Sequence, residues 1–320
     1  MSRFSSESLI QLTVFTILGH TVLANLPVER NFFVVFTVWL LLLSLVGGGW
    51  PFSVPYGRPF KRLWVSGIAM TLILFTTSVV SYALLSSMGL VSLSDVWFWV
   101  IANWSLLFES WPMRHHTPRT ALLVGTVFTL AVALGMHLFF TLFPPTGFLI
   151  LLMHTQLAVA ALFSPFFVFQ GYPFYRLWRQ PRIGFGIFVV SMAAGLGIVT
   201  SPWLSAPHIQ LLFSGIFLWS VLYSWAFGYP LTRKYGQPVR GFLTVPLAVS
   251  IAIAWSYSLT VFLPVERVVE LNLYVVLPAF IIHNTFWFRM PFSPPLLLGM
   301  PPQQHKKLDT LFEWISQIKN

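Results

Sequence analysis

Long apolar stretches alternate with short polar segments along almost the whole chain. A run of about 20 apolar residues crosses the hydrocarbon of a bilayer as a helix, because a helix satisfies its own peptide groups without water. The pattern predicts ten such spans, of which the fourth is the shortest and most polar. The predicted spans are residues 8–26, 31–49, 63–87, 95–110, 120–143, 147–169, 183–200, 209–228, 241–262 and 272–289.

Five of these stretches end in an aromatic or apolar residue followed by proline, and most of the prolines are 61 residues apart. Basic residues, a second proline and a glycine follow most of these corners. We expect the residue before proline to end each helix and its aromatic ring to lie at the lipid headgroups. The corner prolines are Pro51, Pro112, Pro173, Pro230 and Pro291.

The spacing of the corners predicts five tandem two-helix hairpins that are copies of one unit of about 60 residues. Parallel units of this kind are related by an axis along the membrane normal. They can form a ring of helices around a central cavity. The alternative is that any hairpin of two spans and two short loops has about this length, with no duplication.

The short loops alternate between basic and acidic character. Loops rich in Lys and Arg stay in the cytoplasm, so we predict a multi-pass protein of the cell membrane with both termini cytoplasmic. A signal peptide cleaved near Ala24 would leave nine spans in the same orientation. Nine arginines of the basic loops are candidates for contact with anionic headgroups: Arg58, Arg62, Arg114, Arg119, Arg176, Arg179, Arg182, Arg233 and Arg240.

Residues 1–304 therefore read as a single transmembrane domain. In the remaining segment, 305–320, apolar residues recur at helical spacing. This pattern predicts an amphipathic helix that lies on the cytoplasmic membrane surface or packs on neighbouring loops. The apolar positions are Leu308, Leu311, Phe312, Ile315 and Ile318.

The composition agrees with a lipid environment. Hydrophobic residues make up 57% of the chain and charged residues 8%, whereas a soluble domain is about 25% charged. Cysteine is absent, which excludes disulfides, thiolate catalysis and cysteine-bound metals. The net charge of +10 does not indicate nucleic-acid binding, because the basic residues lie in short loops between apolar spans.

Polar side chains within predicted spans are candidates for a solute path, because they are costly in lipid. Hydrogen bonds between helices are the simpler explanation for such residues. The Glu109 carboxylate, near the cytoplasmic end of span four, can take up a proton or pair with a nearby arginine. The candidates are Asn103, Glu109, His137, His154, Gln156, His283 and Asn284.

Three histidines are weak candidates for a metal or haem site. His137 and His154 lie at similar depths in consecutive spans, and His20 lies near the same side of the membrane. Imidazole is a ligand for zinc, copper and haem iron. The chain has no HExxH motif and no cysteine, so no cofactor is predicted.

The leading functional hypothesis is a permease or translocation component for a small or amphipathic solute, with a cavity lined by Asn103, His137, His154 and His283. The alternatives are a membrane-embedded enzyme or redox subunit that uses the histidines, and a non-catalytic scaffold. Membrane lipid is the expected partner. The oligomeric state stays open.

Overall fold

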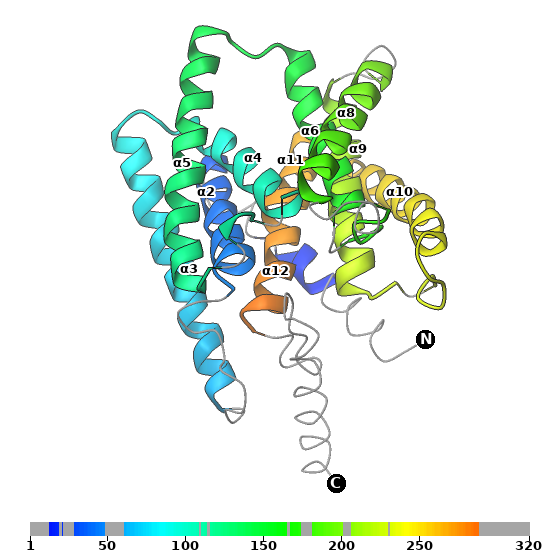
Figure 1. The fold of residues 1–320 in the computed structure, drawn as a ribbon, viewed down its shortest axis with the longest axis horizontal. Helices are drawn as coiled ribbons and strands as arrows, with labels where there is room; N and C mark the ends of the chain where they lie inside the picture. Colours follow the sequence, from blue (N-terminus) through cyan, green and yellow to red (C-terminus); the bar gives the residue numbers. More distant parts are fainter. Residues whose placement is uncertain are drawn as a thin grey trace.

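A computed structural model describes much of the chain, and every regular element within the described part is a helix. The all-α prediction is therefore confirmed for this part. Three predicted corners, at Pro51, Pro230 and Pro291, and the tail helix predicted at 305–320 lie outside it. The described residues are 13–18, 21, 29–48, 61–108, 110–113, 116–164, 167–173, 181–200, 206–229 and 231–287 (Figure 1).

Five helical segments are largely buried in the protein, and we call them the inner helices. Three of them include a π-helical segment. The inner helices are α2 (Arg30–Leu41) with η1 (Leu42–Val46), α4 (Leu93–Leu106), α6 (Gly147–Phe163), α9 (Ala206–Val221) with η3 (Leu222–Ala226), and the continuous helix α11 (Val265–Glu270), η4 (Leu271–Val276) and α12 (Leu277–Thr285).

Four other helices, which we call the outer helices, are α3 (Lys61–Ser87), α5 (Pro118–Leu142), α8 (Pro181–Thr200) and α10 (Val239–Leu259). Only 17% of the apolar stretch of α3 is buried, against 72% in α9. The exposed side chains of the outer helices are large and apolar, as at Leu72, Val127 and Phe242. Continuous apolar surface of this kind requires lipid or a protein partner.

The inner helices contact one another in a closed circuit. Helix α2 packs on α4, α4 on α6, and α6 on α9. Helix α9 packs on α11 and η4, and η4 and α12 return to α2. Each outer helix packs on the inner helix that precedes it in the chain, and α5 also contacts η1. We call the circuit of inner helices the inner ring.

Four helices of the described part are long and apolar enough to cross a membrane: Val65–Ser87, Pro118–Leu142, Ala206–Trp225 and Val239–Leu259. The fourth predicted span, 95–110, is instead the short buried helix α4. Its 14 residues rise about 21 Å, which is less than the roughly 30 Å of a hydrocarbon core. Ten complete spans therefore stay a prediction.

The inner helices end before the corner prolines, in contrast to the expected stop at the residue before proline. Helix α4 ends at Leu106 and α6 at Phe163, several residues ahead of Pro112 and Pro173. A residue with positive φ follows each end, Ser110 at 58° and Gln170 at 52°. A left-handed residue is common where the chain leaves a helix, and here it lies between the end of the helix and the corner proline.

Aromatic rings pack against glycines near the start of the outer helices; one ring comes from an inner helix and three from the turns that follow inner helices. A Cβ atom added at any of four glycines would lie within 3.0 Å of a ring atom, so a larger residue there would require the ring to shift. In three of the four pairs the ring lies four residues before a corner proline. The pairs are Gly67 with Trp287, Gly125 with Trp104, Gly186 with Phe108, and Gly241 with Phe169.

The two ends of the helices differ in charge. At one end, which we call the basic end, the outer helices begin with Lys61, Arg119, Arg182 and Arg240 in or near the first turn. At the opposite, acidic end lie all four acidic residues of the described part: Glu29, Asp95, Glu266 and Glu270. The loop that joins α5 to α6 also lies at the acidic end (Figure 1).

At the basic end, Tyr229 joins two loops instead of lying at the lipid headgroups. Its hydroxyl donates to the Phe167 carbonyl oxygen at 2.6 Å and accepts from Gln170 Nε2 at 3.3 Å. The Arg240 guanidinium lies 5.3 Å from the centroid of the Tyr229 ring. Burial raises the pKa of Tyr229 to about 12, so the hydroxyl stays protonated and keeps donating. The corner tyrosine therefore fixes the α6–α8 loop against the α9–α10 loop.

Candidate functional site

Five side chains from four inner helices converge at the acidic end. Arg30 begins α2, Asp95 lies in the first turn of α4, and His154 belongs to α6, while Glu270 and Tyr274 belong to α11 and η4. Arg30 Nη2 lies 3.2 Å from Asp95 Oδ1, and the two side chains are 54% and 44% exposed. We call these five residues the acidic-end cluster. Its ion pair is partly exposed.

The Arg30 guanidinium is surrounded by groups that favour a positive charge. Its Cζ atom lies 5.9 Å from the centroid of the buried Tyr274 ring, a distance at which a cation is attracted to the ring face. The carboxylates of Asp95 and Glu270 both act on it electrostatically. Glu270 is itself paired with Arg267, Nη1 to Oε2, at 2.9 Å.

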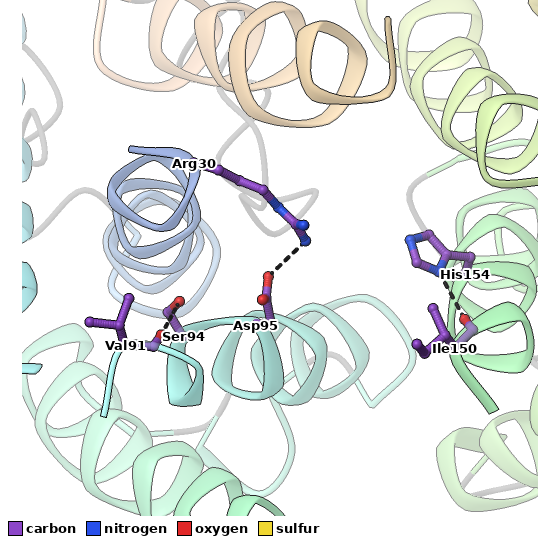
Figure 2. Close-up of polar contacts among 6 residues, drawn as sticks. All are labelled: Arg30, Val91, Ser94, Asp95, Ile150 and His154. Carbon is purple, nitrogen blue, oxygen red and sulfur yellow. Dashed lines mark hydrogen bonds and ion pairs between the residues drawn. The ribbon is translucent and has the colours of Figure 1, made fainter. Parts of the chain in front are cut away.

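His154 faces this ion pair from the other side. Its Nδ1 lies 2.8 Å from the carbonyl oxygen of Ile150, and a carbonyl can only accept, so Nδ1 carries a proton. The other ring nitrogen points from α6 towards Arg30 and Asp95 (Figure 2). The charges of Arg30 and Asp95 both act on the imidazole.

Local structure explains why Arg30 and Asp95 pair. A carboxylate in the first turn of a helix is stabilised by the helix dipole, whereas a cation there is not. Asp95 therefore suits the start of α4, and it supplies the negative charge that Arg30 needs at the start of α2. Ser94, next to Asp95, donates from Oγ to the Val91 carbonyl oxygen at 2.7 Å (Figure 2).

The cluster rests on a packed apolar layer. Phe98, one turn below Asp95, contacts the Tyr274 ring edge-on with centroids 6.3 Å apart. Both side chains are buried, and Val34, Ile101 and Val276 nearby in the inner helices are fully buried. Within one or two helical turns of the cluster, the inner helices are therefore packed with buried apolar side chains.

Two candidates from the sequence, Asn103 and Gln156, are bonded to each other between α4 and α6. Gln156 Nε2 donates to Asn103 Oδ1, and Asn103 Nδ2 donates to the Trp99 carbonyl oxygen at 2.8 Å. Both amides are buried, and Gln156 Oε1 has no hydrogen-bond partner among the described residues. This arrangement matches the interhelical hydrogen bond that was the alternative to a solute path.

A second buried polar group, centred on Asn272, joins η4 to α9 and α10. Its Oδ1 accepts from Trp255 Nε1 at 3.1 Å, and its Nδ2 donates to Ser214 Oγ at 3.3 Å and to Ser256 Oγ at 3.4 Å. Asn272 is fully buried. It fixes three helices together in the apolar interior.

Of the remaining polar candidates, His137 and His283 lie outside the cluster. His137 is half-exposed on α5, which packs on α4 and η1, whereas His154 lies on α6, which packs mainly on α8 and α9. His283 is buried in α12 against the Phe15 ring. Asn284 also lies in α12. Glu109 and His20 lie outside the described residues.

The metal candidates are not supported by the described part of the chain. None of its groups of three or more His, Asp or Glu side chains is arranged to hold a metal ion.

The arginines proposed for headgroup contact differ among themselves. Arg119 and Arg233 are exposed at the basic end, whereas Arg240 donates to the carbonyl oxygens of Tyr235 and Arg233. Arg62 and Arg182 lie in the first turns of α3 and α8, and Arg58, Arg114, Arg176 and Arg179 lie outside the described residues.

Sequence reasoning missed most of the acidic-end cluster. Arg30 and Glu270 fell between predicted spans, Asp95 stood at the first position of the predicted span 95–110, and Tyr274 within the tenth span was not singled out. The available signal was that an arginine and an aspartate each stand at the first turn of an apolar helix, on the same predicted side of the membrane. Their pairing across 65 residues depends on the closure of the inner ring.

Comparison with known proteins adds no relative: no protein-family model matches the chain, and no curated protein or solved structure is significantly similar to it.

Proposed function

We propose that this chain is a membrane permease or translocation component whose solute binds at the acidic-end cluster. The observation that carries the proposal is the convergence of Arg30, Asp95 and His154, from three inner helices, at partly exposed positions. Ionisable side chains near the apolar interior are costly and are typical of solute and ion paths. The apolar layer at Phe98 supplies the barrier that a carrier needs beneath its binding site.

The proposed location is the cell membrane, with the acidic end outside and both termini in the cytoplasm. Outer helices α3, α5, α8 and α10 have no acidic residue in their first turn, although the helix dipole favours one there. They carry basic residues instead. Retention of positive charge in the cytoplasm and attraction to anionic headgroups explain this placement.

The proposed architecture is ten spans in five hairpins related by rotation about the membrane normal. It is supported by the regular alternation of inner and outer helices and by the aromatic rings that pack on the glycines of the outer helices. Trp287, Phe108 and Phe169 hold the same position relative to their corner prolines. In the first unit the residue at that position is Gly47, which has no ring. The ring that packs on Gly125 comes from Trp104 instead.

A thermal-unfolding screen tests the proposed function. We expect at least one class of small water-soluble metabolite to raise the Tm of the protein in lipid nanodiscs by a few degrees, because ligand binding stabilises the folded state by mass action. The double variant Arg30→Leu/Asp95→Leu should lose this response, since it removes both charges and leaves neither one unpaired.

The matched control is Glu266→Gln, which removes an exposed carboxylate at the same end but outside the cluster. It should respond like the unmodified protein. If no metabolite raises the Tm of the unmodified protein, the chain is not a solute-binding permease component. If the double variant responds as strongly as the unmodified protein, the solute binds elsewhere.

A further inference from the structure

We infer that the solute is a small zwitterion, with its carboxylate on Arg30 and its ammonium group between Asp95 and His154; this inference rests on the proposed function. It follows from the kinds of hydrogen-bonding groups that the cluster presents and from the balance of their charges. Free α-amino acids and related amino acids are the simplest members of this class.

Arg30 has hydrogen-bonding capacity left for an anion. A guanidinium has five N–H donors in a planar fork that matches the two oxygens of a carboxylate. The ion pair with Asp95 is made by Nη2 alone, at 3.2 Å, and more than half of the side chain is exposed. Tyr274 also occupies one side of the guanidinium, through a side-chain hydrogen bond and a ring centroid 5.9 Å from Cζ, which limits the direction from which a carboxylate can approach.

Asp95 and His154 present acceptors that suit an ammonium group. A carboxylate only accepts hydrogen bonds, and Asp95 engages Arg30 through a single oxygen, Oδ1. In the neutral imidazole of His154 the proton is on Nδ1, because Nδ1 donates to Ile150. The second nitrogen then carries a lone pair, and it points towards Arg30 and Asp95 (Figure 2).

The charges of the cluster balance, which favours a neutral solute with two charged ends. Arg30 is matched by Asp95, and Glu270 is matched by Arg267. A zwitterion adds no net charge and gives each of its ends an opposite charge. A simple amine or a simple carboxylate would leave one charge without a counterpart above an apolar floor, which is costly.

Matched ligands distinguish these solutes. Glycine, leucine and phenylalanine would be compared with their decarboxylated amines and their N-acetyl derivatives, by Tm in nanodiscs and by isothermal titration. We expect one or more of the free amino acids to bind. The corresponding amine and N-acetyl derivative should bind at least about tenfold more weakly, because each lacks a charge-assisted hydrogen bond.

Two single variants locate the contacts. Arg30→Gln should weaken amino-acid binding at least about tenfold while retaining most of the weak binding of the amine. Asp95→Asn should also weaken amino-acid binding at least about tenfold, while retaining most of the weak binding of the N-acetyl derivative. Circular dichroism and the unliganded Tm would show that both variants are folded. Unchanged amino-acid binding in both variants would overturn the assignment.

The outcomes separate this inference from the proposed function. If amines, simple carboxylates or uncharged metabolites bind and the amino acids do not, the zwitterion class is wrong while the permease proposal stands. If the full metabolite screen also gives no binding, both are wrong. The comparison among ligands uses the unmodified protein, so it gives a result even if one variant fails to fold.

Discussion

A protein carrying Gly215→Leu is expected to lose the packing of α9 on α10 and to yield little folded material. A Cβ atom at Gly215 would lie closer than 3.0 Å to Ser256 Oγ and 3.2 Å from the backbone oxygen of Ala252. The backbone oxygen can move away only if the helices separate. Overpacking of a buried contact costs about 1–3 kcal/mol even for small additions, and leucine adds a whole branched side chain. The measurements are yield and Tm by fluorescence-detected size-exclusion chromatography.

The matched control is Gly135→Leu in α5. Gly135 is exposed, and a Cβ atom added there would have nothing within 4 Å, so the new side chain extends from the surface of the protein. This variant should retain the Tm of the unmodified protein within a few degrees. If the two variants behave alike, close contact between α9 and α10 is not what holds the helices together.

Asn272→Leu is expected to lower the free energy of unfolding by about 2 kcal/mol, because it leaves Trp255 Nε1 without its acceptor and removes two further hydrogen bonds. The estimate lies between the cost of an unpaired buried donor and the smaller values measured for hydrogen bonds within membranes. Denaturation in mixed micelles, followed by intrinsic tryptophan fluorescence, provides the measurement.

A double-mutant cycle separates this hydrogen bond from changes in packing. Trp255→Phe removes the indole donor and keeps an aromatic ring. If the bond carries the effect, Asn272→Leu should cost less in the Trp255→Phe background than in the unmodified protein. Equal costs in the two backgrounds would show that Asn272 does not stabilise the fold through Trp255.

The class of fold was predictable from the sequence because it depends on local composition. A chain with 8% charged residues cannot cover a water-soluble surface, and helices are the economical way to satisfy its backbone in lipid. The glycines after the corners were visible as a pattern. Their packing against Trp287, Phe108 and Phe169 was not visible, because these contacts join different hairpins.

Helix ends and helix lengths were predicted less well. Proline is easy to see in a sequence, but the positive φ values of Ser110 and Gln170 are not, because neither residue type signals a left-handed backbone. Helix α4 was extended to residue 110 because apolar residues continue past Leu106. Hydropathy does not distinguish a short helix buried in protein from one that crosses lipid.

The candidate site was predicted only in part. His154 was the one member of the acidic-end cluster identified from the sequence, because polar residues within apolar runs stand out; Asn103 and Gln156 were identified in the same way but form a separate hydrogen bond. Arg30 and Asp95 did not stand out, because charged residues are expected next to the ends of spans. Which of these charges face one another is decided by the closure of the inner ring, which requires the three-dimensional contacts.

The accessibility of single cysteines to a membrane-impermeant maleimide in intact cells tests the outward-facing cluster most directly, since the chain has no cysteine of its own. We predict that Pro145→Cys and His154→Cys react from outside, and that Tyr235→Cys at the basic end reacts only after permeabilisation. A solute that binds the cluster should slow the labelling of His154→Cys and leave that of Pro145→Cys unchanged. Labelling of Tyr235→Cys in intact cells, or His154→Cys that stays unreactive while Pro145→Cys reacts, would contradict an outward-facing cluster.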